Sequence, residues 1–558
     1  MSESGESSSS EHDVLIAGGG LAGLTLALQL RDAMPDLDVR VVERRSHPAP
    51  EAAHKIGESS VEIGAHYFAE TLGLREHLDA RHLRKFGFRF FFSEGERDLQ
   101  GVTELGASRY MTTPSWQIDR GIFENFLAEE AVRRGARIDS GTAVKRIELD
   151  PAGHRVTVER DGKRETITAR WLIDASGRAG LLKRKLDLAE DNAHDANAVW
   201  FRVSERLEID EWVADPAWRA RCSPPARWLS TNHLCGAGYW LWLIPLGSGA
   251  HSVGIVADAA MHPLSTMNTF GKAMEWIAAH QPSAHDALTR VFADKPDALM
   301  DFAYFKNFSY GCKQVFSDQR WALAGDAGLF LDPFYSPGSD FIAIGNTFIT
   351  DLIRGDRAGE KIRTSTLLHG ELFRSFYEST LTLYQDQYAL FGNARVMPVK
   401  VLWDYTYYWG VLCQLVFQNR LTDRKAILAL GEPLQRARRL NEHMQLLMRA
   451  WGEATDPKQR RGESSGESAG ALARKAAHRG AMLDQASLPW FAELNRGLRD
   501  TLDDDGFHAR VVANVAQLEA LAEAIVAMAT HDAPQLAGLI KVGLKPQVDA
   551  SLLFGMAA

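Results

Sequence analysis

Cysteine is scarce in this sequence, with four among 558 residues. The four stand far apart and no two form a CxxC pair; they are Cys222, Cys235, Cys312 and Cys413. The 18 histidines are scattered without the spacing of metal ligands. We therefore predict no disulfide framework and no metal site, and we expect a reducing, cytoplasmic compartment.

An excess of positive charge and a long unbroken apolar run are also lacking. There are 63 basic and 72 acidic residues, a net charge of −9, which argues against a nucleic-acid partner. Residues 1–11 are rich in Ser and Glu, so we expect a disordered N-terminus rather than a signal peptide or anchor. The apolar stretch 399–417 contains Lys400 and Asp404, which predicts a buried or interfacial helix and no transmembrane segment.

What the chain does contain is a dinucleotide-binding loop near its N-terminus. An expected strand (12–17) leads into the GxGxxG pattern of Gly18, Gly20 and Gly23, and an expected helix (21–33) follows. The first glycine allows the tight turn, the second lets the backbone approach a pyrophosphate, and the third lets helix and strand pack closely. A lone GxGxxG is a weak signal, but its position between a strand and a helix makes it specific.

An acidic residue follows the loop at the spacing expected for ribose recognition. Glu43 stands twenty residues beyond the loop, at the end of a second expected strand (39–42). A carboxylate there is placed to bind a ribose hydroxyl. We assign Glu43 and the adjacent Arg44 to cofactor binding.

Two later patterns favour FAD over NAD. Asp-Ala-Ser-Gly at 174–177 and Trp-Ala-Leu-Ala-Gly-Asp-Ala-Gly at 321–328 resemble the hydroxylase-like flavoprotein superfamily, the second stretch being similar to its second FAD fingerprint. The resemblance implies that Gly325 and Asp326 touch the ribityl or pyrophosphate region and that Arg120 contacts the flavin. A second GxGxxG is not found, so we expect a separate flavin reductase to supply the reducing equivalents.

A tryptophan motif lies between these two fingerprints. Residues 240–245 read Trp-Leu-Trp-Leu-Ile-Pro and resemble the WxWxIP signature of flavin-dependent halogenases. Two tryptophans at i and i+2 are also typical of simple packing on one face of a strand. The Ile-Pro ending and the position in the chain favour the motif. The resemblance implies that Trp240 and Trp242 keep a substrate from the flavin, favouring halide oxidation over direct hydroxylation.

A second stretch resembles the same family. Residues 330–338, Phe-Leu-Asp-Pro-Phe-Tyr-Ser-Pro-Gly, carry the Phe, Pro, Ser and Gly of its other signature. The resemblance implies that Pro333 contacts the flavin and that Ser336 and Gly338 belong to a halide site. A turn with exposed backbone amides is a suitable site for chloride or bromide.

Lys85 is the candidate catalytic residue. Gly57, Glu58 and Ser59 form the Gly-Glu-Ser flavin loop of the family, and Lys85 follows on what we expect to be the next strand. The resemblance implies that its amine hydrogen-bonds hypohalous acid or forms a haloamine beside the substrate. Desolvation would lower the pKa of such an amine and help nucleophilic attack. The alternative is an ordinary solvated surface lysine.

The sequence departs from the family at two positions. Pro337 stands where one of two halide-binding N–H groups is expected, and proline has no N–H. A lost hydrogen bond to a charged group costs roughly 1.5–3 kcal/mol, although Ser339 or a water could substitute. Tyr335 stands where tryptophan halogenases carry a glutamate, which favours a phenol, another electron-rich ring or a polyene over free tryptophan.

These patterns together predict an α/β protein of two or three structural units. We expect an FAD-binding, Rossmann-like core of the hydroxylase type over 12–350, with a β-rich substrate region interleaved at about 80–115 and 195–310. The remaining expected parts are a helical region (351–452), a polar linker (453–470) and a helical extension (471–558).

Three functions stay open at this point. The first is a halogenase in which chloride or bromide is oxidised at a flavin hydroperoxide and Lys85 delivers the halogen to a small-molecule or carrier-protein-bound aromatic or polyene. The second is a monooxygenase or dehydrogenase that has lost halide binding, which Pro337 favours. The third is a non-catalytic flavin-binding scaffold. Halide dependence of the product separates the first two.

Overall fold

The computed structural model describes residues 10–51, 56–455, 478–539, 544 and 550–554. The predicted disordered N-terminus and the predicted linker lie mostly outside these residues. Where they overlap, the structure shows regular elements: strand β1 begins at Ser10 and helix α14 extends to Thr455.

The described chain divides into two compact units. The first unit comprises residues up to 80, 118–192 and 309–376, and the second comprises 81–117, 193–308 and 377 onward. The predicted helical region 351–452 therefore divides between them. Helix α9 (Gly338–Arg357) belongs to the first unit and helix α11 (Met397–Tyr407) to the second.

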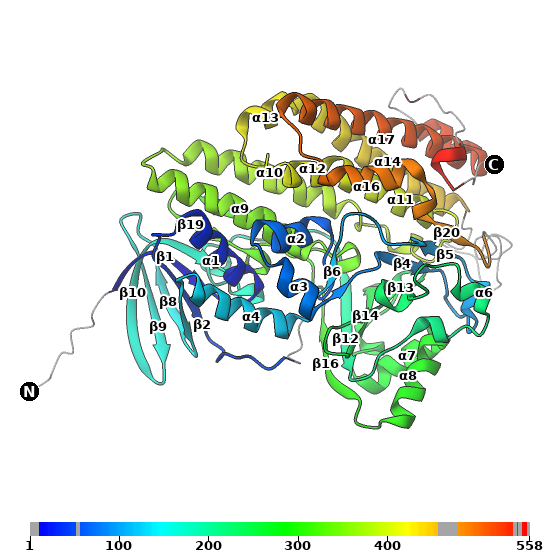
Figure 1. Ribbon diagram of the computed structural model, residues 1–558, viewed down its shortest axis with the longest axis horizontal. Helices are drawn as coiled ribbons and strands as arrows, with labels where there is room; N and C mark the ends of the chain where they lie inside the picture. Colours follow the sequence, from blue (N-terminus) through cyan, green and yellow to red (C-terminus); the bar gives the residue numbers. More distant parts are fainter. Residues whose placement is uncertain (1–9, 52–55, 456–477, 540–543, 545–549, 555–558) are drawn as a thin grey trace, which may run out of the picture. The chain divides into compact units, whose positions relative to one another are not determined.

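The first unit is built on a mainly parallel sheet (Figure 1). Its strands, in spatial order, are β18 (Phe316–Ser317), β19 (Trp321–Leu323), β10 (Lys163–Asp174), β1 (Ser10–Ala17), β2 (Val39–Glu43) and β7 (Arg137–Ser140). β8 (Ala143–Glu148) and β9 (His154–Arg160) extend β10 as an antiparallel meander. Val14, Leu15 and Ile16 of the central β1 are fully buried, as expected for a parallel strand covered on both faces.

Four helices of the first unit pack against one another. α1 (Leu21–Ala33) contacts α4 (Arg120–Arg133) and α9, and α2 (Glu62–His66) also contacts α9. The predicted helix over 21–33 is confirmed to the residue. Because β1 ends at Ala17 and α1 begins at Leu21, the glycine loop is the turn between them.

The second unit is built on an eight-stranded mixed sheet. Its strands, in spatial order, are β16 (Leu299–Phe305), β12 (Ala196–Val203), β15 (His251–Asp258), β14 (Tyr239–Pro245), β13 (Thr231–Gly236), β4 (Phe88–Phe91), β5 (Glu104–Gly106) and β20 (Met482–Asp484). β20 comes from the C-terminal part of the chain, which was predicted to be helical, and pairs in parallel with β5. A three-residue strand has no periodicity of its own, so only the partner strand reveals it.

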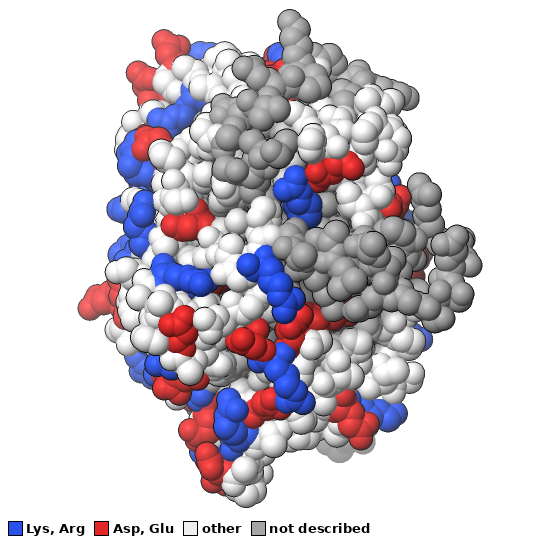
Figure 2. Space-filling view, turned by 90° about the vertical axis from the view of Figure 1, so that its right-hand side faces the viewer, with Lys and Arg blue, Asp and Glu red and all other residues white. Residues whose placement is uncertain are grey.

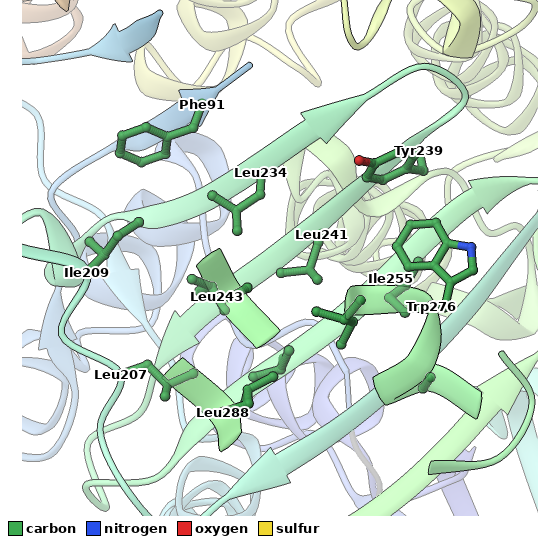
Figure 3. Packing of buried hydrophobic residues seen from close by; sticks show 14 of the residues in the cluster. Phe91, Leu207, Ile209, Leu234, Tyr239, Leu241, Leu243, Ile255, Trp276 and Leu288 are labelled. Atoms are coloured by element: carbon green, nitrogen blue, oxygen red, sulfur yellow. The ribbon is translucent and has the colours of Figure 1, made fainter. Parts of the chain in front are cut away.

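The two faces of this sheet differ in chemistry. One face is mostly aliphatic: Leu234, Leu241, Leu243 and Ile255 pack with α7 (Phe270–His280) and α8 (Pro282–Asp294) (Figure 3). Since side chains alternate along a strand, the intervening residues face the other way. That opposite face is aromatic, and its members include Phe88, Phe90, His233, Trp240 and Trp242. We call these five residues the aromatic face.

A buried charge cluster joins β4 and β5 to the loop before β13. Arg227 Nε donates to Glu104 Oε1 over 2.7 Å, and Arg89 donates to the same carboxylate. All three side chains are essentially unexposed. Removing the carboxylate would take the shared anion from both buried guanidinium groups, and Arg227 would keep its longer contact of 3.4 Å with Asp210.

We therefore expect Glu104→Gln to lower the free energy of unfolding of the second unit by about 3–5 kcal/mol. Urea denaturation followed by near-UV circular dichroism measures the loss. Glu205→Gln is the matched control, because Glu205 belongs to the same unit and its pair with Lys295 is exposed, where water screens the two charges. Equal effects of the two substitutions would contradict the expectation.

The C-terminal helices of the second unit bury the stretch 399–417. α11 continues through a π-helical turn (Tyr408–Leu412) into α12 (Cys413–Phe417). Lys400 is unexposed, and its Nζ lies 2.7 Å from Asp404 Oδ2 and 2.9 Å from Gln445 Oε1. The two charges that argued against a membrane span therefore neutralise each other inside a helix bundle.

One described helix is long and apolar enough to cross a membrane by length and composition alone. It is α17 (Asp504–Asp532), and 56% of its most apolar window is buried inside the structure. α17 packs against α14 (Gly431–Thr455). This packing is the environment of a core helix in a folded domain.

Surface charges of both signs intermingle. On the face drawn in Figure 2, Lys and Arg side chains alternate with Asp and Glu and do not gather by sign. Exposed pairs such as Arg357 with Asp36 and Arg449 with Asp386 illustrate the pattern. This face therefore differs from the basic patches that bind nucleic-acid backbones.

Candidate flavin site and lysine cluster

The glycine loop of the first unit has the geometry that a bound dinucleotide requires. Gly18 has φ +126°, and a Cβ there would lie 2.2 Å from the carbonyl oxygen of Ala175. A Cβ on Gly23 would lie 2.0 Å from the Gly18 oxygen. A Cβ on Gly20 would meet nothing within 4 Å. The first and third glycines are thus required by the protein itself, whereas the space at Gly20 is open for a ligand.

Glu43 is tied to this loop. It ends β2, is 6% exposed, and its Oε2 accepts the Gly19 N–H over 2.8 Å. Its Oε1 accepts the Arg45 N–H over 2.9 Å. The carboxylate therefore holds the loop to the end of β2. Arg44 is exposed directly after the strand.

The Gly-Glu-Ser loop contacts the predicted flavin arginine. Arg120 begins α4, and its Nη1 donates to the Ile56 oxygen over 2.8 Å. Gly57 has φ +82°, and a Cβ there would lie 2.8 Å from the same guanidinium. The Ile118 N–H donates to the Glu58 oxygen over 2.6 Å. Glu58 and Ser59 are buried, and the two hydrogen bonds join this loop to the start of α4.

Asp326 is surrounded by cations. It follows Gly325, which has φ +58°. Burial raises the pKa of Asp326, while the positive charges of Arg120, Arg178 and Lys183 act in the opposite direction. The structure therefore brings together Arg120 and Asp326, which the sequence analysis named separately. Arg120 also pairs with Glu124 Oε1 over 2.5 Å, so the region contains both cations and carboxylates.

Arg178, Lys183 and Tyr310 were missed by the sequence analysis. Lys183 Nζ donates to the Gly328 oxygen over 3.0 Å and lies 3.8 Å from the Tyr310 ring centroid. The Tyr310 hydroxyl donates to the backbone carbonyl oxygen of Asp326 over 2.7 Å. Arg178 follows the Asp-Ala-Ser-Gly pattern directly, so that pattern was the signal that could have found it.

These observations test whether FAD fits. The open space at Gly20, the carboxylate at the end of β2 and the cations near Asp326 are the features that a dinucleotide needs for close approach, hydrogen bonding and charge. The residues that would hold it are Gly18, Gly20, Glu43, Arg120 and Asp326.

The predicted halide loop leads into α9. Pro333 begins a short 3-10 turn, Ser336 has φ +53°, and Pro337 is the residue before Gly338, the first residue of α9. The N–H groups of Asp340 and Phe341 both donate to the Pro337 oxygen over 3.0 Å. In the part of the chain that the structure describes, the backbone N–H groups of Gly338 and Ser339 donate to no protein group.

Ser339 and Asp340 have a structural role. Asp340 Oδ1 accepts the Gly64 N–H over 2.8 Å, which joins α9 to α2. A Cβ on Gly64 would lie 2.2 Å from the Ser339 hydroxyl. The pair therefore fixes the close packing of these two helices.

In the second unit, Lys85 is not a surface lysine. It follows β3 (Leu83–Arg84) in the link to β4 rather than lying on a strand, which corrects the expected position. The Lys85 N–H donates to the Ser115 oxygen over 2.8 Å. The side chain is 4% exposed, and Nζ lies 3.4 Å from the centroid of the Phe88 ring.

The two motif tryptophans lie on the aromatic face. Their ring centroids are 5.7 Å apart on β14. Trp240 Nε1 donates to the Tyr388 hydroxyl over 3.2 Å and Trp242 Nε1 donates to Ser252 Oγ over 3.1 Å. Both indoles are thus held in fixed positions.

His233 connects Lys85 with the tryptophans and was not identified from the sequence. Its ring centroid lies 5.3 Å from that of Phe88 and 4.7 Å from that of Trp240. Lys85, Phe88, His233 and Trp240 therefore form a continuous cluster, which we call the lysine cluster. A single histidine between apolar residues carries no motif, so the sequence offered no signal for it.

Comparison with known proteins agrees with this geometry. A family model described as an FAD binding domain matches residues 11–234. The flavin-dependent halogenase chlA of Dictyostelium discoideum is 26% identical over 467 residues, covering 76% of this chain and 75% of the relative. A 1H-pyrrole-2-carbonyl-(peptidyl-carrier protein) chlorinase of Pseudomonas fluorescens is 28% identical over 350 residues, covering 59% of this chain and 72% of the relative.

Solved structures share the fold over most of the chain. The halogenase PltM in complex with phloroglucinol and FAD superposes with a TM-score of 0.61 at 17% identity, covering 89% of this chain and 99% of that chain. The flavin-dependent halogenase CmlS has a TM-score of 0.53 at 23% identity, covering 68% of this chain and 64% of that chain. The predicted α/β fold with a helical C-terminal region is confirmed.

The fold, the dinucleotide site and the matched FAD-binding model define an FAD-dependent oxidoreductase. Within that class, the relatives that match three quarters of its length are flavin-dependent halogenases. The resemblance drawn from the sequence motifs is thereby confirmed.

Proposed function

We propose that this protein halogenates an electron-rich aromatic ring, using FAD, oxygen and chloride or bromide, with Lys85 presenting the halogen to the substrate. FAD, when bound and reduced by a separate flavin reductase, would react with oxygen and so supply the oxidant for the halide. The observation that carries the proposal is the enclosed amine of Lys85 in contact with the Phe88 ring.

An amine in this position suits the delivery of hypohalous acid. Water is largely excluded from Lys85, which is 4% exposed, so a bound hypohalous acid is protected from wasteful side reactions. The Phe88 ring against Nζ fixes the amine in one place. Positioning of an electrophile next to a ring lowers the entropic part of the barrier.

The substrate that we favour is a phenol. Tyr335 stands in place of the glutamate of tryptophan halogenases, so a ring activated by its own hydroxyl needs less help from a carboxylate. The structural neighbour PltM is seen in complex with phloroglucinol, a polyhydroxybenzene. Two relatives act on a pyrrole attached to a peptidyl-carrier protein, so a carrier-bound ring is a further substrate to test. A polyene, the other electron-rich substrate expected from the sequence, is tested beside it.

The halide site that we propose lies between Ser336 and the first turn of α9. The N–H groups of Gly338 and Ser339 point to a donor pair shifted by one residue from the family's pair, because Pro337 has no N–H. With this shifted pair of donors we expect the site still to bind halide, but with a lower affinity than the family's pair gives.

Replacing Pro337 with alanine is expected to restore the missing donor. Pro337 has φ −73°, which alanine adopts without strain. We expect the KM for bromide to fall about tenfold, the effect of one hydrogen bond to a charged group. Initial rates at a series of bromide concentrations measure it. Pro282→Ala, at the start of α8, is the matched control, and an unchanged KM in Pro337→Ala would place the halide elsewhere.

The second candidate function is an FAD-dependent monooxygenase or dehydrogenase that no longer binds halide, which Pro337 favours. A flavoprotein/dehydrogenase from Cytophaga hutchinsonii shares the fold with a TM-score of 0.53. A non-catalytic flavin-binding scaffold is the third. We also propose a cytoplasmic location, supported by four cysteines that are free thiols.

One experiment separates these functions. The purified protein is supplied with FAD, a flavin reductase, NADH, oxygen and bromide, and it is offered phenols, polyenes and a carrier-bound pyrrole. Mass spectrometry reads the products. A bromine isotope doublet supports the halogenase. Products that gain only oxygen or lose hydrogen, without dependence on bromide, support the second function, and flavin binding without turnover supports the third.

A further inference from the structure

His233 is a buried imidazole for which the proposed halogenase mechanism so far has no use. Strand register places it: in β13 it pairs with Phe90 of β4 on one side and with Trp242 of β14 on the other. It is 1% exposed. Its ring centroid lies 5.0 Å from that of Phe90, in addition to the contacts with Phe88 and Trp240 given above. Three strands thus converge to hold one imidazole in the lysine cluster.

The electrostatic surroundings keep this imidazole neutral. Burial lowers the pKa of His233 well below its usual value, and the positive charge of Lys85 lowers it further. A neutral imidazole has one ring nitrogen that accepts a hydrogen bond. The same lysine charge stabilises a negative charge that develops nearby. Proton acceptor and positive charge therefore occur in one enclosed cluster.

We propose that His233 is a catalytic residue that accepts the hydroxyl proton of a phenolic substrate bound beside Lys85. This inference rests on the proposed halogenase function and names its substrate class. Lys85 and His233 are enclosed to the same degree and both contact Phe88, so a ring that reaches the amine also enters the surroundings of the imidazole. The neutral imidazole accepts a hydrogen bond from the phenol, and it takes the proton only as the carbon–halogen bond forms, because the hydroxyl of the positively charged ring is then a much stronger acid than an imidazolium of low pKa.

The step balances with hypohalous acid as the oxidant. A ring carbon ortho or para to the hydroxyl bonds to the halogen, the halogen–oxygen bond breaks, and the departing hydroxide takes a proton from the Lys85 ammonium to leave as water. The ring carbon then loses its proton, which returns to Lys85. His233 returns the hydroxyl proton to the oxygen. The ring is oxidised by two electrons and the hypohalous acid is reduced, so ring and hypohalous acid give haloarene and water.

A purely structural role for His233 makes a different prediction. An imidazole that only packs between aromatic rings would affect every substrate equally when replaced. An imidazole that accepts a hydroxyl proton discriminates between a phenol and the corresponding methyl ether, because the ether has no proton to give. The comparison of these two substrates therefore isolates the proposed role from general damage.

The test uses the FAD-loaded, full-length protein with a resorcinol-type phenol and its fully O-methylated ether. In His233→Phe, which keeps a ring in place, kcat/KM for the phenol is expected to fall about 100-fold while that for the ether is unchanged. His233→Asn and His233→Gln each retain an acceptor near one of the two ring nitrogens, and one of them is expected to recover part of the phenol rate. His251→Phe, another buried histidine of the same sheet, is the matched control.

A binding measurement separates this inference from the proposed function. Calorimetric titration of the FAD-loaded protein, without halide or reductant, is expected to show a preference for the phenol over the ether of about tenfold, lost in His233→Phe. Equal effects of His233→Phe on phenol and ether overturn the inference, even if the wild type halogenates both. A His233-dependent binding preference in a protein that yields no halogenated product supports the acceptor role and overturns the halogenase function.

Discussion

Replacing Lys85 with alanine is expected to reduce the rate of halogenation on the order of 10³-fold, the usual contribution of a positioned catalytic side chain. The physical reason is that alanine leaves the aromatic rings of the lysine cluster in place but removes the amine that holds hypohalous acid. Mass spectrometry of the brominated product over time, under single-turnover conditions, measures the loss.

The flavin content should stay unchanged in this variant. Lys85 belongs to the second unit, whereas the glycine loop, Arg120 and Asp326 belong to the first. Bound FAD and NADH-dependent oxygen consumption are therefore expected to match the wild type. Lys295→Ala, an exposed lysine of the second unit, serves as the control. Full retention of brominated product in Lys85→Ala would refute the role assigned to this amine.

Replacing Gly18 with valine is expected to weaken FAD binding strongly and to destabilise the first unit. A side chain at φ +126° is strained, and its Cβ would lie 2.2 Å from the Ala175 oxygen, which is backbone and cannot move aside cheaply. Strain and overpacking together cost about 3 kcal/mol or more. If FAD binds only when the loop has its original shape, the binding free energy is reduced by this cost, and FAD affinity falls about 100-fold. Flavin absorbance after gel filtration and a thermal melt measure the two effects.

Gly20→Val distinguishes cofactor contact from folding. The space at Gly20 is open in the protein alone, so this substitution should leave the melting temperature of the FAD-free protein unchanged while it blocks the approach of the pyrophosphate. Gly271→Ala, at another open position on α7 of the second unit, should retain FAD. Normal FAD content in Gly20→Val would show that the cofactor does not approach the loop at this glycine.

The local motifs were readable from the sequence because their chemistry is contained in short segments. The strand, glycine turn and helix around Gly18 occupy 10–33, and their conformational requirements follow from the residues themselves. Pairing between strands that are distant in the sequence was harder to predict. The three-residue β20 looks like part of a helical extension until its partner β5 is known. The expected strand at Lys85 failed because β3 ends at Arg84 and β4 begins only at Phe88.

The sequence by itself indicated FAD and the resemblance to flavin-dependent halogenases, because glycine spacing, the acidic residue at the end of β2 and the tryptophan and Pro-Ser-Gly motifs are local patterns with specific physical requirements. Only the tertiary structure decided what surrounds each functional group. It enclosed Lys85, gathered Arg178 and Lys183 near Asp326, and placed His233 among the rings of the lysine cluster. The reason is that the pairing of β13 with β4 joins residues more than a hundred positions apart in the chain, and such pairing leaves no periodic trace in either strand.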